Sequence, residues 1–183
     1  MITLNKQTKA FTLIELVFVI VVLGILAALA LPRMDRDLRQ EAKDNLLSAI
    51  RYTQHLALND DKTDPFDASW QDKLWNISFA SDGSDYNISS DTNVAIDPAN
   101  GKPMDGTGSP NVLIGKKYGV SGITGCGGLI AFDHLGRPFT ALTATNNYSA
   151  YMPANCTIAV TFQGGITPLN ITIATETGYV SGD

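Results

Sequence analysis

The pattern of apolar and polar residues divides this chain into three parts. Residues 11–31 are almost continuously apolar, and Glu15 is the one charged residue among them. A helix rises about 1.5 Å per residue, so this run would be roughly 30 Å long, close to the thickness of the hydrocarbon core of a bilayer. The run is apolar on every face, unlike an amphipathic surface helix. We therefore expect a transmembrane helix at residues 11–31.

Residues 32–58 have the spacing of an amphipathic helix. Apolar residues recur there every three or four positions, and most charged residues lie off the stripe that they form. The stripe consists of Met34, Leu38, Ala42, Leu46, Ile50, Thr53 and Ala57. We expect the first helix to continue through residues 32–58 and to pack this stripe on a folded domain. The polar residues that follow and Asp64-Pro65 should end the helix.

From residue 74 onward, short runs of β-branched and aromatic residues alternate with Gly, Asn, Asp and Ser, which is typical of strands and turns. The predicted strands are residues 74–80, 86–89, 112–114, 129–133, 138–142, 157–163, 169–175 and 179–180. Residues 98–111 are predicted to form a loop, and Trp70 and Trp75 to pack under the helix. The expected fold class is α+β: a long N-terminal helix packed on a C-terminal antiparallel β-sheet domain, formed by residues 59–183.

A short motif marks the start of the apolar run. The residues from Lys9 to Glu15, KAFTLIE, resemble the class III signal of type IV pilins and type II secretion pseudopilins. In that family a prepilin peptidase cuts before the aromatic residue, and the new amino terminus is methylated. The resemblance implies that residues 1–10 are a cleaved leader, that cleavage falls between Ala10 and Phe11, and that Phe11 is N-methylated. The family usually has Gly before the cut, so Ala10 predicts slower processing.

The resemblance also implies roles for Glu15 and Pro32. After cleavage Glu15 would be the fifth residue of the mature chain, where the family has its glutamate. A carboxylate in lipid is costly unless it is paired, so Glu15 is expected to pair with the Phe11 amine of a neighbouring subunit and to set the register between subunits during assembly. The alternative interpretation is a glutamate that is only tolerated near the membrane surface. Pro32 lies where the family commonly has a proline that bends the helix.

Charges on both sides of the apolar run bear on its orientation. Lys6 and Lys9 favour a cytoplasmic N-terminal end, whereas the arginines after the run weaken this preference. The resemblance implies a single-pass protein of the inner membrane, with residues 32–58 and the C-terminal domain in the periplasm or in an extracellular filament (a fimbrium). Its expected partners are other pilin or pseudopilin subunits bound through the N-terminal helix, the prepilin peptidase and an inner-membrane assembly platform. A secretory signal and a plain membrane anchor are the alternatives.

Two predicted hairpins indicate which subgroup of the family the chain resembles. Residues 130–138 (IAFDHLGRP) and 170–180 each combine two short strands with a turn that contains Gly. Both resemble the C-terminal sheet of the H-type minor pseudopilins and related minor pilins, and two generic β-hairpins are the alternative. We therefore expect a minor subunit that acts in type II secretion, that is, in protein secretion, or in pilus initiation. A major type IV pilin that forms the fibre and a membrane-anchored binding domain that does not polymerise stay open as alternatives.

The chain has two cysteines, Cys126 and Cys156. If the domain lies outside the cytoplasm, an oxidising compartment lets them form a disulfide, and closing a loop of about 30 residues would contribute roughly 3–4 kcal/mol to stability. Two buried free thiols are the alternative. The acidic segments 82–85 and 91–97 lack the spacing of a twelve-residue calcium loop and are interpreted as solvated turns. No metal site is predicted.

Charge and motifs limit the remaining classes of function. The formal net charge is −5, and loss of Lys6 and Lys9 with the leader would make the protein more acidic, which argues against binding of nucleic acid. The sequence has no Gly-x-Ser-x-Gly elbow, no His-Glu-x-x-His motif and no phosphate-binding loop. We predict no enzyme activity, no catalytic residue and no cofactor, and the expected function is structural.

Overall fold

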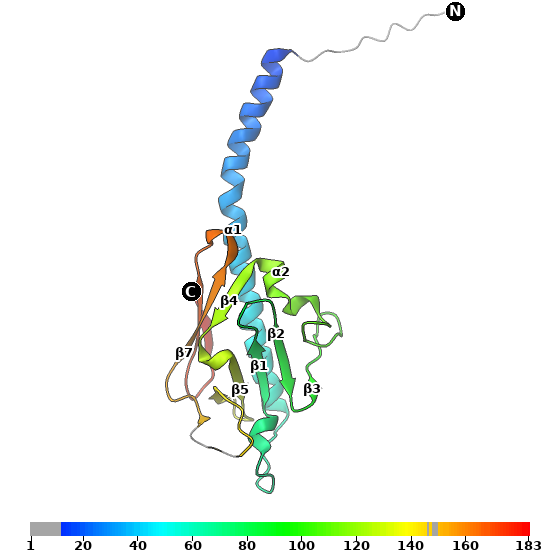
Figure 1. Cartoon of the computed structure of the whole chain (residues 1–183), viewed down its shortest axis with the longest axis vertical. Coiled ribbons are helices and arrows are strands. Elements are labelled where there is room, and N and C mark those ends of the chain that lie inside the picture. The colour runs from blue at the N-terminus through cyan, green and yellow to red at the C-terminus, as the bar shows by residue number, and fades with distance from the viewer. Residues whose placement is uncertain (1–11, 146, 148–149) are drawn as a thin grey trace, which may run out of the picture. The chain divides into compact units, whose positions relative to one another are not determined.

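A computed structural model describes residues 12–145, 147 and 150–183, and the side chains of residues 29–36 are not among those described. The predictions for Ala10 and Phe11 therefore lie outside the described residues. The chain divides into two units, Met1–Asp37 and Leu38–Asp183. One helix, α1 (Leu13–Asn59), begins in the first unit and ends in the second. Figure 1 shows α1 in blue and cyan.

In the first unit, α1 begins at Leu13 and passes through Pro32 without a break in its helical assignment. No helix in the described part of the chain combines the length and the hydropathy of a membrane span. The transmembrane helix at residues 11–31 stays a prediction, as does a bend at Pro32.

In the second unit, α1 packs its predicted stripe into the core. The buried residues of the stripe are Ala42, Leu46, Ile50, Thr53 and Ala57. Leu47 and Ala49 are buried beside them, so the buried face is wider than a single stripe. The helix ends at Asn59, whose Nδ2 donates to the backbone O of His55 at 2.7 Å. The continuation of the first helix and its packing on a folded domain are therefore confirmed.

The rest of the second unit forms two antiparallel sheets, with strand orders β3-β2-β1-β5-β6 and β4-β7-β8-β9. The first contains β1 (Trp75–Phe79), β2 (Tyr86–Ser90), β3 (Asn93–Val94), β5 (Leu129–Phe132) and β6 (Pro138–Phe139). The second contains β4 (Val120–Thr124), β7 (Cys156–Phe162), β8 (Leu169–Ile173) and β9 (Val180–Gly182). Both sheets lie beside the cyan part of α1 (Figure 1). The α+β fold class is confirmed, and the strands of the domain form two sheets.

The two sheets and α1 share one hydrophobic core. In the first sheet Ile77 on β1 pairs with Ile88 on β2 and with Ile130 on β5. In the second sheet Ile158 on β7 pairs with Ile171 on β8. These isoleucines belong to the same buried cluster as the stripe of α1. Side chains of one face of a strand are two residues apart, so the alternation along β7 and β8 places their apolar residues against the helix.

Short helices connect the strands. They are η1 (Trp70–Lys73), η2 (Pro110–Val112), α2 (Ile114–Tyr118), η3 (Cys126–Gly128) and η5 (Gln163–Gly165). The strand predicted at residues 112–114 is wrong, because η2 and α2 occupy this segment. Pro110 has a backbone φ that suits the start of a helix, and Ser109 Oγ accepts the N–H of Asn111 as a cap. Local capping therefore outweighs the β-branched composition here.

Most of the other strand predictions agree with the structure. Strands β1, β2, β5, β7 and β8 are confirmed within two residues at each end. The strand predicted at residues 138–142 is shorter, because β6 ends at Phe139. The sequence did not predict β3 or β4, and β4 contains Gly122 and a bulge in its pairing with β7. Both predicted hairpins are present, as β5–β6 and β8–β9.

The two tryptophans lie in different environments. A second buried cluster consists of Trp70, Leu74, Ala131 and Phe139, and none of its described members comes from α1. Ala131 follows Ile130 on β5, and successive residues of a strand face opposite sides of the sheet. The predicted packing of Trp70 under the helix is therefore wrong. Trp75 packs against the main core, and its Nε1 donates to Asp60 Oδ2 at 2.9 Å.

Long polar side chains of α1 bind the C-terminal segment. Arg39 Nη2 lies 3.2 Å from Asp183 Oδ1, and Lys43 Nζ donates to the backbone O of Asp183 at 3.3 Å. Arg51 Nη2 donates to the backbone O of Val180 at 3.1 Å. The Arg39–Asp183 pair is partly exposed, so we expect little net stability from it alone. Together these contacts fix β9 and the last residue beside the helix.

Candidate functional site

The first turn of α1 contains the predicted assembly residue, Glu15. The backbone N–H of Glu15 donates to Thr12 Oγ1 at 3.3 Å, and that of Leu16 donates to the backbone O of Thr12 at 3.2 Å. Thr12 is thus the N-cap residue of the helix. The order Thr-x-x-Glu is that of a capping box, and a carboxylate in the first turn also interacts favourably with the helix dipole. This capping role was not predicted, although the spacing was visible in the sequence.

Apolar side chains surround Glu15 and are exposed. Leu13 is 81% exposed and Phe18 is 69% exposed. The other large apolar residues exposed along this part of α1 are Ile14, Leu16, Val17, Val19, Ile20, Val21, Leu23, Ile25 and Leu26. Continuous apolar surface of this kind on a soluble protein marks a site of contact with lipid or protein. The arrangement can therefore bury itself in a membrane or in a bundle of similar helices.

Glu15 is the charged residue within this apolar surface. Placing it in lipid or in a helix bundle removes water from its carboxylate, which is costly unless a cation replaces the water. Ala10 and Phe11 lie outside the described residues, so the structure leaves the cleavage site, the methylation site and the pairing of Glu15 with the Phe11 amine as predictions.

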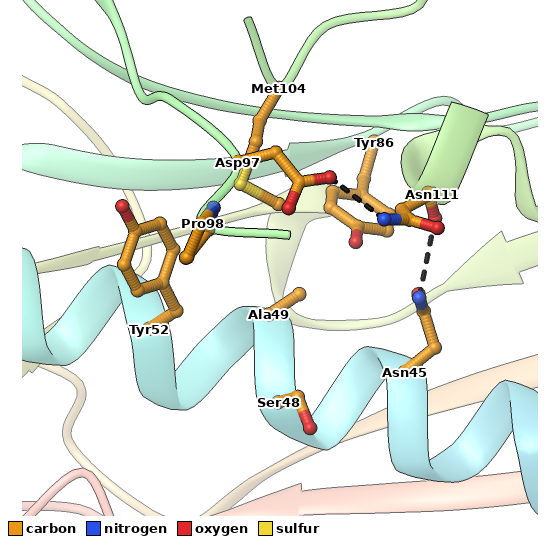
Figure 2. A pocket seen from close by; sticks show the side chains of 9 residues that line it. All are labelled: Asn45, Ser48, Ala49, Tyr52, Tyr86, Asp97, Pro98, Met104 and Asn111. Atoms are coloured by element: carbon orange, nitrogen blue, oxygen red, sulfur yellow. Dashed lines mark hydrogen bonds between the residues drawn. The ribbon is translucent and has the colours of Figure 1, made fainter. Parts of the chain in front are cut away.

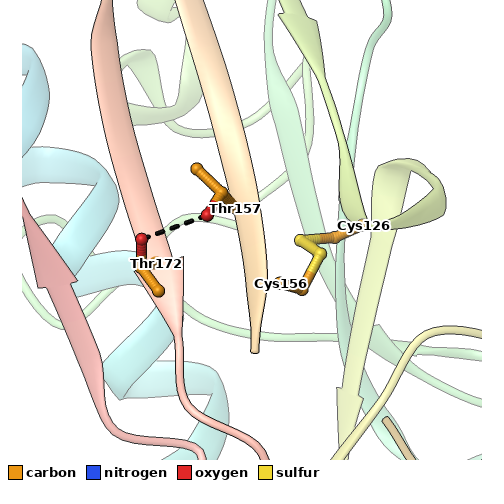
Figure 3. Close-up of a disulfide and its surroundings, with 4 residues drawn as sticks. All are labelled: Cys126, Cys156, Thr157 and Thr172. Carbon is orange, nitrogen blue, oxygen red and sulfur yellow. Dashed lines mark hydrogen bonds between the residues drawn. A yellow bond between two sulfur atoms is a disulfide. The ribbon is translucent and has the colours of Figure 1, made fainter. Parts of the chain in front are cut away.

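Cys126 and Cys156 form a disulfide, with their Cα atoms 5.7 Å apart. Cys126 begins η3, between β4 and β5, and Cys156 begins β7 (Figure 3). The bond therefore ties the link between the two sheets to a central strand of the second sheet. Beyond it, the hydroxyls of Thr157 and Thr172 lie 3.2 Å apart across β7 and β8. The predicted pairing is confirmed, and the alternative of two free thiols is wrong.

Asp97 does not lie in a solvated turn, contrary to our interpretation of residues 91–97. Its side chain is 4% exposed and accepts hydrogen bonds at both oxygens. The donors are the backbone N–H of Ala99 and the side chains of Asn100, Ser109 and Asn111. Burial raises the pKa of Asp97, but these hydrogen bonds outweigh burial and hold the pKa below its usual value. The loop between β3 and η2 is thus organised around one carboxylate.

The β5–β6 hairpin contains a second buried carboxylate. Asp133 is 1% exposed and accepts the backbone N–H groups of Leu135 and Arg137 at 3.0 and 2.9 Å. Its other oxygen accepts Nε of Arg137 at 2.7 Å, and the Arg137 guanidinium lies 4.6 Å from the centre of the Tyr151 ring. Gly136 has a φ of 79°, which suits the turn. The Asp-x-x-Gly-Arg pattern is therefore explained by the geometry of the β5–β6 turn.

The described residues contain no group of three or more His, Cys, Asp or Glu side chains that could hold a metal ion.

Comparison with known proteins identifies the N-terminal segment. Residues 5–31 match a family model described as the prokaryotic N-terminal methylation motif. The chain carries the type IV pilin and pseudopilin signal. This signal belongs to structural subunits rather than to enzymes, and it includes the predicted cleavage site, Glu15 and the exposed start of α1. No curated protein and no solved structure matches the chain.

Proposed function

We propose that this protein is a structural subunit of a type IV pilus or of a type II secretion pseudopilus, and that it is a minor subunit acting in filament assembly or protein secretion. The observation that supports this most directly is the apolar first part of α1, which is exposed, contains Glu15 in its first turn and falls within the methylation motif. A helix with this surface needs lipid or other helices around it.

In this proposal, residues 11–31 are first stored in the inner membrane as a single span, with the second unit in the periplasm. The prepilin peptidase cuts between Ala10 and Phe11, and Phe11 is methylated. An inner-membrane assembly platform then transfers the helix into a bundle, where apolar contacts with lipid are replaced by apolar contacts with protein. Glu15 pairs with the Phe11 amine of a neighbour, so that one axial register is preferred.

The disulfide supports a location outside the cytoplasm. Disulfides persist in oxidising compartments such as the bacterial periplasm and are rare in the cytosol. The bond between Cys126 and Cys156 lies in the second unit, which would be the periplasmic part of the protein.

The two hairpins favour a minor subunit over a major one. The β5–β6 and β8–β9 hairpins are present at the residues that resemble the C-terminal sheet of H-type minor pseudopilins. A major pilin, which would form the fibre for adhesion or motility, shares the N-terminal motif, and so the motif does not separate the two.

Quantitative mass spectrometry of sheared filaments tests the proposal, with the amino terminus read in the same samples. A minor subunit should be rare in the filaments, cell-bound and cut before Phe11. If the chain dominates the fibre and begins at methylated Phe11, the minor role is wrong and the protein is a major pilin. If cells contain only the uncut form beginning at Met1, the structural-subunit proposal is wrong, and a plain membrane anchor is favoured.

A further inference from the structure

A small pocket lies between α1 and the loop that Asp97 organises (Figure 2). Its volume is about 200 Å³. It is lined by Asn45, Ser48, Ala49, Tyr52, Tyr86, Asp97, Pro98, Met104 and Asn111. Pockets for drug-sized molecules are usually 300 Å³ or larger, so this one suits a small group or a single side chain.

The walls of the pocket combine two aromatic rings with a carboxylate. Figure 2 shows Asp97 above Ala49, with the Tyr52 ring on one side and the Tyr86 ring on the other. Tyr52 Oη donates to the backbone O of Ile96 at 2.9 Å, which fixes its ring at the edge of the pocket. Aromatic faces attract cations, and a nearby carboxylate strengthens that attraction.

Asp97 has neutral hydrogen-bond donors but no cationic partner among the described residues. Asn100, Ser109 and Asn111 all donate to Oδ2, whereas Oδ1 accepts the backbone N–H of Ala99 at 2.8 Å. A carboxylate oxygen has two lone pairs, so Oδ1 retains capacity for a further donor. The negative charge is therefore buried and hydrogen-bonded, but it is not neutralised by a positive charge.

A second acceptor lines the same pocket without a donor. Asn45 Nδ2 donates to the backbone O of Asn111 at 3.3 Å, whereas Asn45 Oδ1 is buried and has no hydrogen-bond partner. The Asn45 side chain also lies within hydrogen-bond reach of the Tyr86 hydroxyl, so its polar end is held inside the protein. The negative charge of Asp97 also affects the hydroxyl groups of the two tyrosines that line the pocket. Burial and the charge of Asp97 raise the pKa values of both Tyr52 and Tyr86.

From this arrangement we infer that the pocket binds a primary alkylammonium group, such as the end of a lysine side chain. An ammonium has three donors and no acceptor, which fits the lone pair that Asp97 Oδ1 retains. Its methylenes would contact Ala49, Met104 and the tyrosine rings. An anion is excluded by the charge of Asp97, and a neutral alkyl group would leave that charge without a counter-ion. The ammonium comes either from a partner protein or from a free amine.

Methyl NMR of the methionines tests this inference on the full chain in detergent micelles. The chain has four methionines, and with [¹³C]methyl labelling Met104 reports on the pocket while Met152, which is buried elsewhere, is an internal control. Addition of n-butylammonium should shift the Met104 signal in a saturable way and leave Met152 unchanged. n-Butanol, which has the same chain without the charge, should give no saturable shift.

Variants test whether Asp97 and the pocket cause the shift. Asp97→Asn should weaken binding of n-butylammonium about tenfold or more, because the contact loses its charge. If this variant fails to fold, Ser48 provides a second test, since its exposed side chain lies on the rim of the pocket. Ser48→Leu should cover the pocket and abolish the shift, whereas Ser48→Ala should preserve it.

The two sources of the ammonium are separated by a blocked lysine, Nα-acetyl-lysine methylamide. An equal shift with this compound supports a lysine side chain of a partner protein, and a shift with n-butylammonium alone supports a free amine. The inference is overturned if neither amine shifts Met104, if n-butanol acts as well as the amine, or if Ser48→Leu binds like the parent. These outcomes do not depend on whether the protein assembles into a filament.

Discussion

At the scale of single residues, Asp97 shows how neutral hydrogen-bond donors allow a charge to be buried. Removing a carboxylate from water costs free energy, and here four donors replace the lost water. Because those donors come from residues spread over the loop from Ala99 to Asn111, the same bonds hold the loop in one conformation. The stability of the loop should therefore depend on the ionised form of Asp97.

We predict that Asp97→Asn lowers the free energy of unfolding by about 1–3 kcal/mol at pH 7, because an amide replaces one acceptor oxygen with a donor that has no partner. The pKa of Asp97 is lowered by folding. Its contribution is therefore complete well above the unfolded value of about 4 and is lost as the pH falls through the lower folded value. Denaturant unfolding at pH 7 and at pH 3 should show a smaller loss on acidification in the variant than in the parent.

Asp91→Asn is the matched control for this change. Asp91 is exposed and has a φ of 55°, a conformation that asparagine adopts readily. The control should unfold like the parent at both values of pH. Equal effects of the two substitutions would contradict the role that we assign to Asp97.

Gly178 provides the second prediction at this scale. A Cβ atom at this position would lie 2.5 Å from the backbone O of Gly136 and 2.6 Å from Gln54 Nε2, and the φ of Gly178 is 63°. The turns of both hairpins meet the helix here, since Gln54 Nε2 donates to the backbone O atoms of Gly136 and Thr177. Gly178→Ala should therefore destabilise the protein by about 2–4 kcal/mol, from backbone strain and overpacking together.

Gly164→Ala separates these two causes. Gly164 has a similar φ of 74°, but no heavy atom lies within 4 Å of an added Cβ. Only the backbone strain of about 1–2 kcal/mol should appear in this variant. Thermal or denaturant unfolding of both variants measures the difference, and a Gly178→Ala variant no less stable than Gly164→Ala would show that the hairpin turns can separate from the helix.

At the scale of elements, the sequence correctly predicted the helices and strands whose own residues carry a clear hydrophobic periodicity. The stripe of α1 has a helical period, and β7 and β8 alternate, so burial followed the pattern. The segment at residues 112–114 was misassigned, because Pro110 and the Ser109 cap favour a helical turn over a strand. Strand β4 was missed because Gly122 gives it low strand propensity, and pairing with β7 supplies what the local sequence lacks.

The candidate functional features likewise include some that the sequence could predict and some that it could not. The motif from Lys9 to Glu15 is contiguous, so the sequence alone was enough to find it. The Asp97 pocket brings together α1, β2 and the loop before η2. These elements are separated along the chain, so no pattern of neighbouring residues predicts the pocket. The disulfide lies between these cases. An expected location outside the cytoplasm made a disulfide possible, but only the fold places Cys126 beside Cys156.

The disulfide connects elements, and its loss should weaken the second unit. It closes a loop with a sequence separation of 30 residues, which corresponds to roughly 3–4 kcal/mol in the chain-entropy description. We predict that a reductant lowers the denaturant midpoint of the parent protein by a corresponding amount. The double variant Cys126→Ser, Cys156→Ser should unfold like the reduced parent and should not respond to the reductant. The prediction would be contradicted if the denaturant midpoint of the parent stayed the same after its disulfide had been reduced.

At the scale of the whole molecule, the two units differ in how much apolar side-chain surface they expose. The first unit exposes large apolar side chains continuously along α1, whereas the second encloses most of its apolar residues in two clusters and exposes only scattered ones such as Phe66. A continuous apolar surface requires other molecules around it, and scattered exposed residues do not. A chain of this kind is suited to attach a folded domain to a membrane or to a filament. In the function that we propose, Glu15 separates the two uses, because pairing with the Phe11 amine of a neighbour is needed in a filament and not in a plain anchor.

We predict that Glu15→Val leaves the total and membrane-bound amounts of the protein unchanged, because it removes the one charged residue from residues 11–31. Its incorporation into filaments should fall about tenfold or more, since the substitution removes the charge that would pair with the Phe11 amine. Glu41→Val is the control: it makes the same chemical change at an exposed position of α1 in the second unit. Quantitative mass spectrometry of membranes and sheared filaments measures both effects. Normal incorporation of the Glu15 variant would contradict the assembly role that we propose for Glu15, whereas absence of the parent protein from the filaments would contradict the structural-subunit proposal.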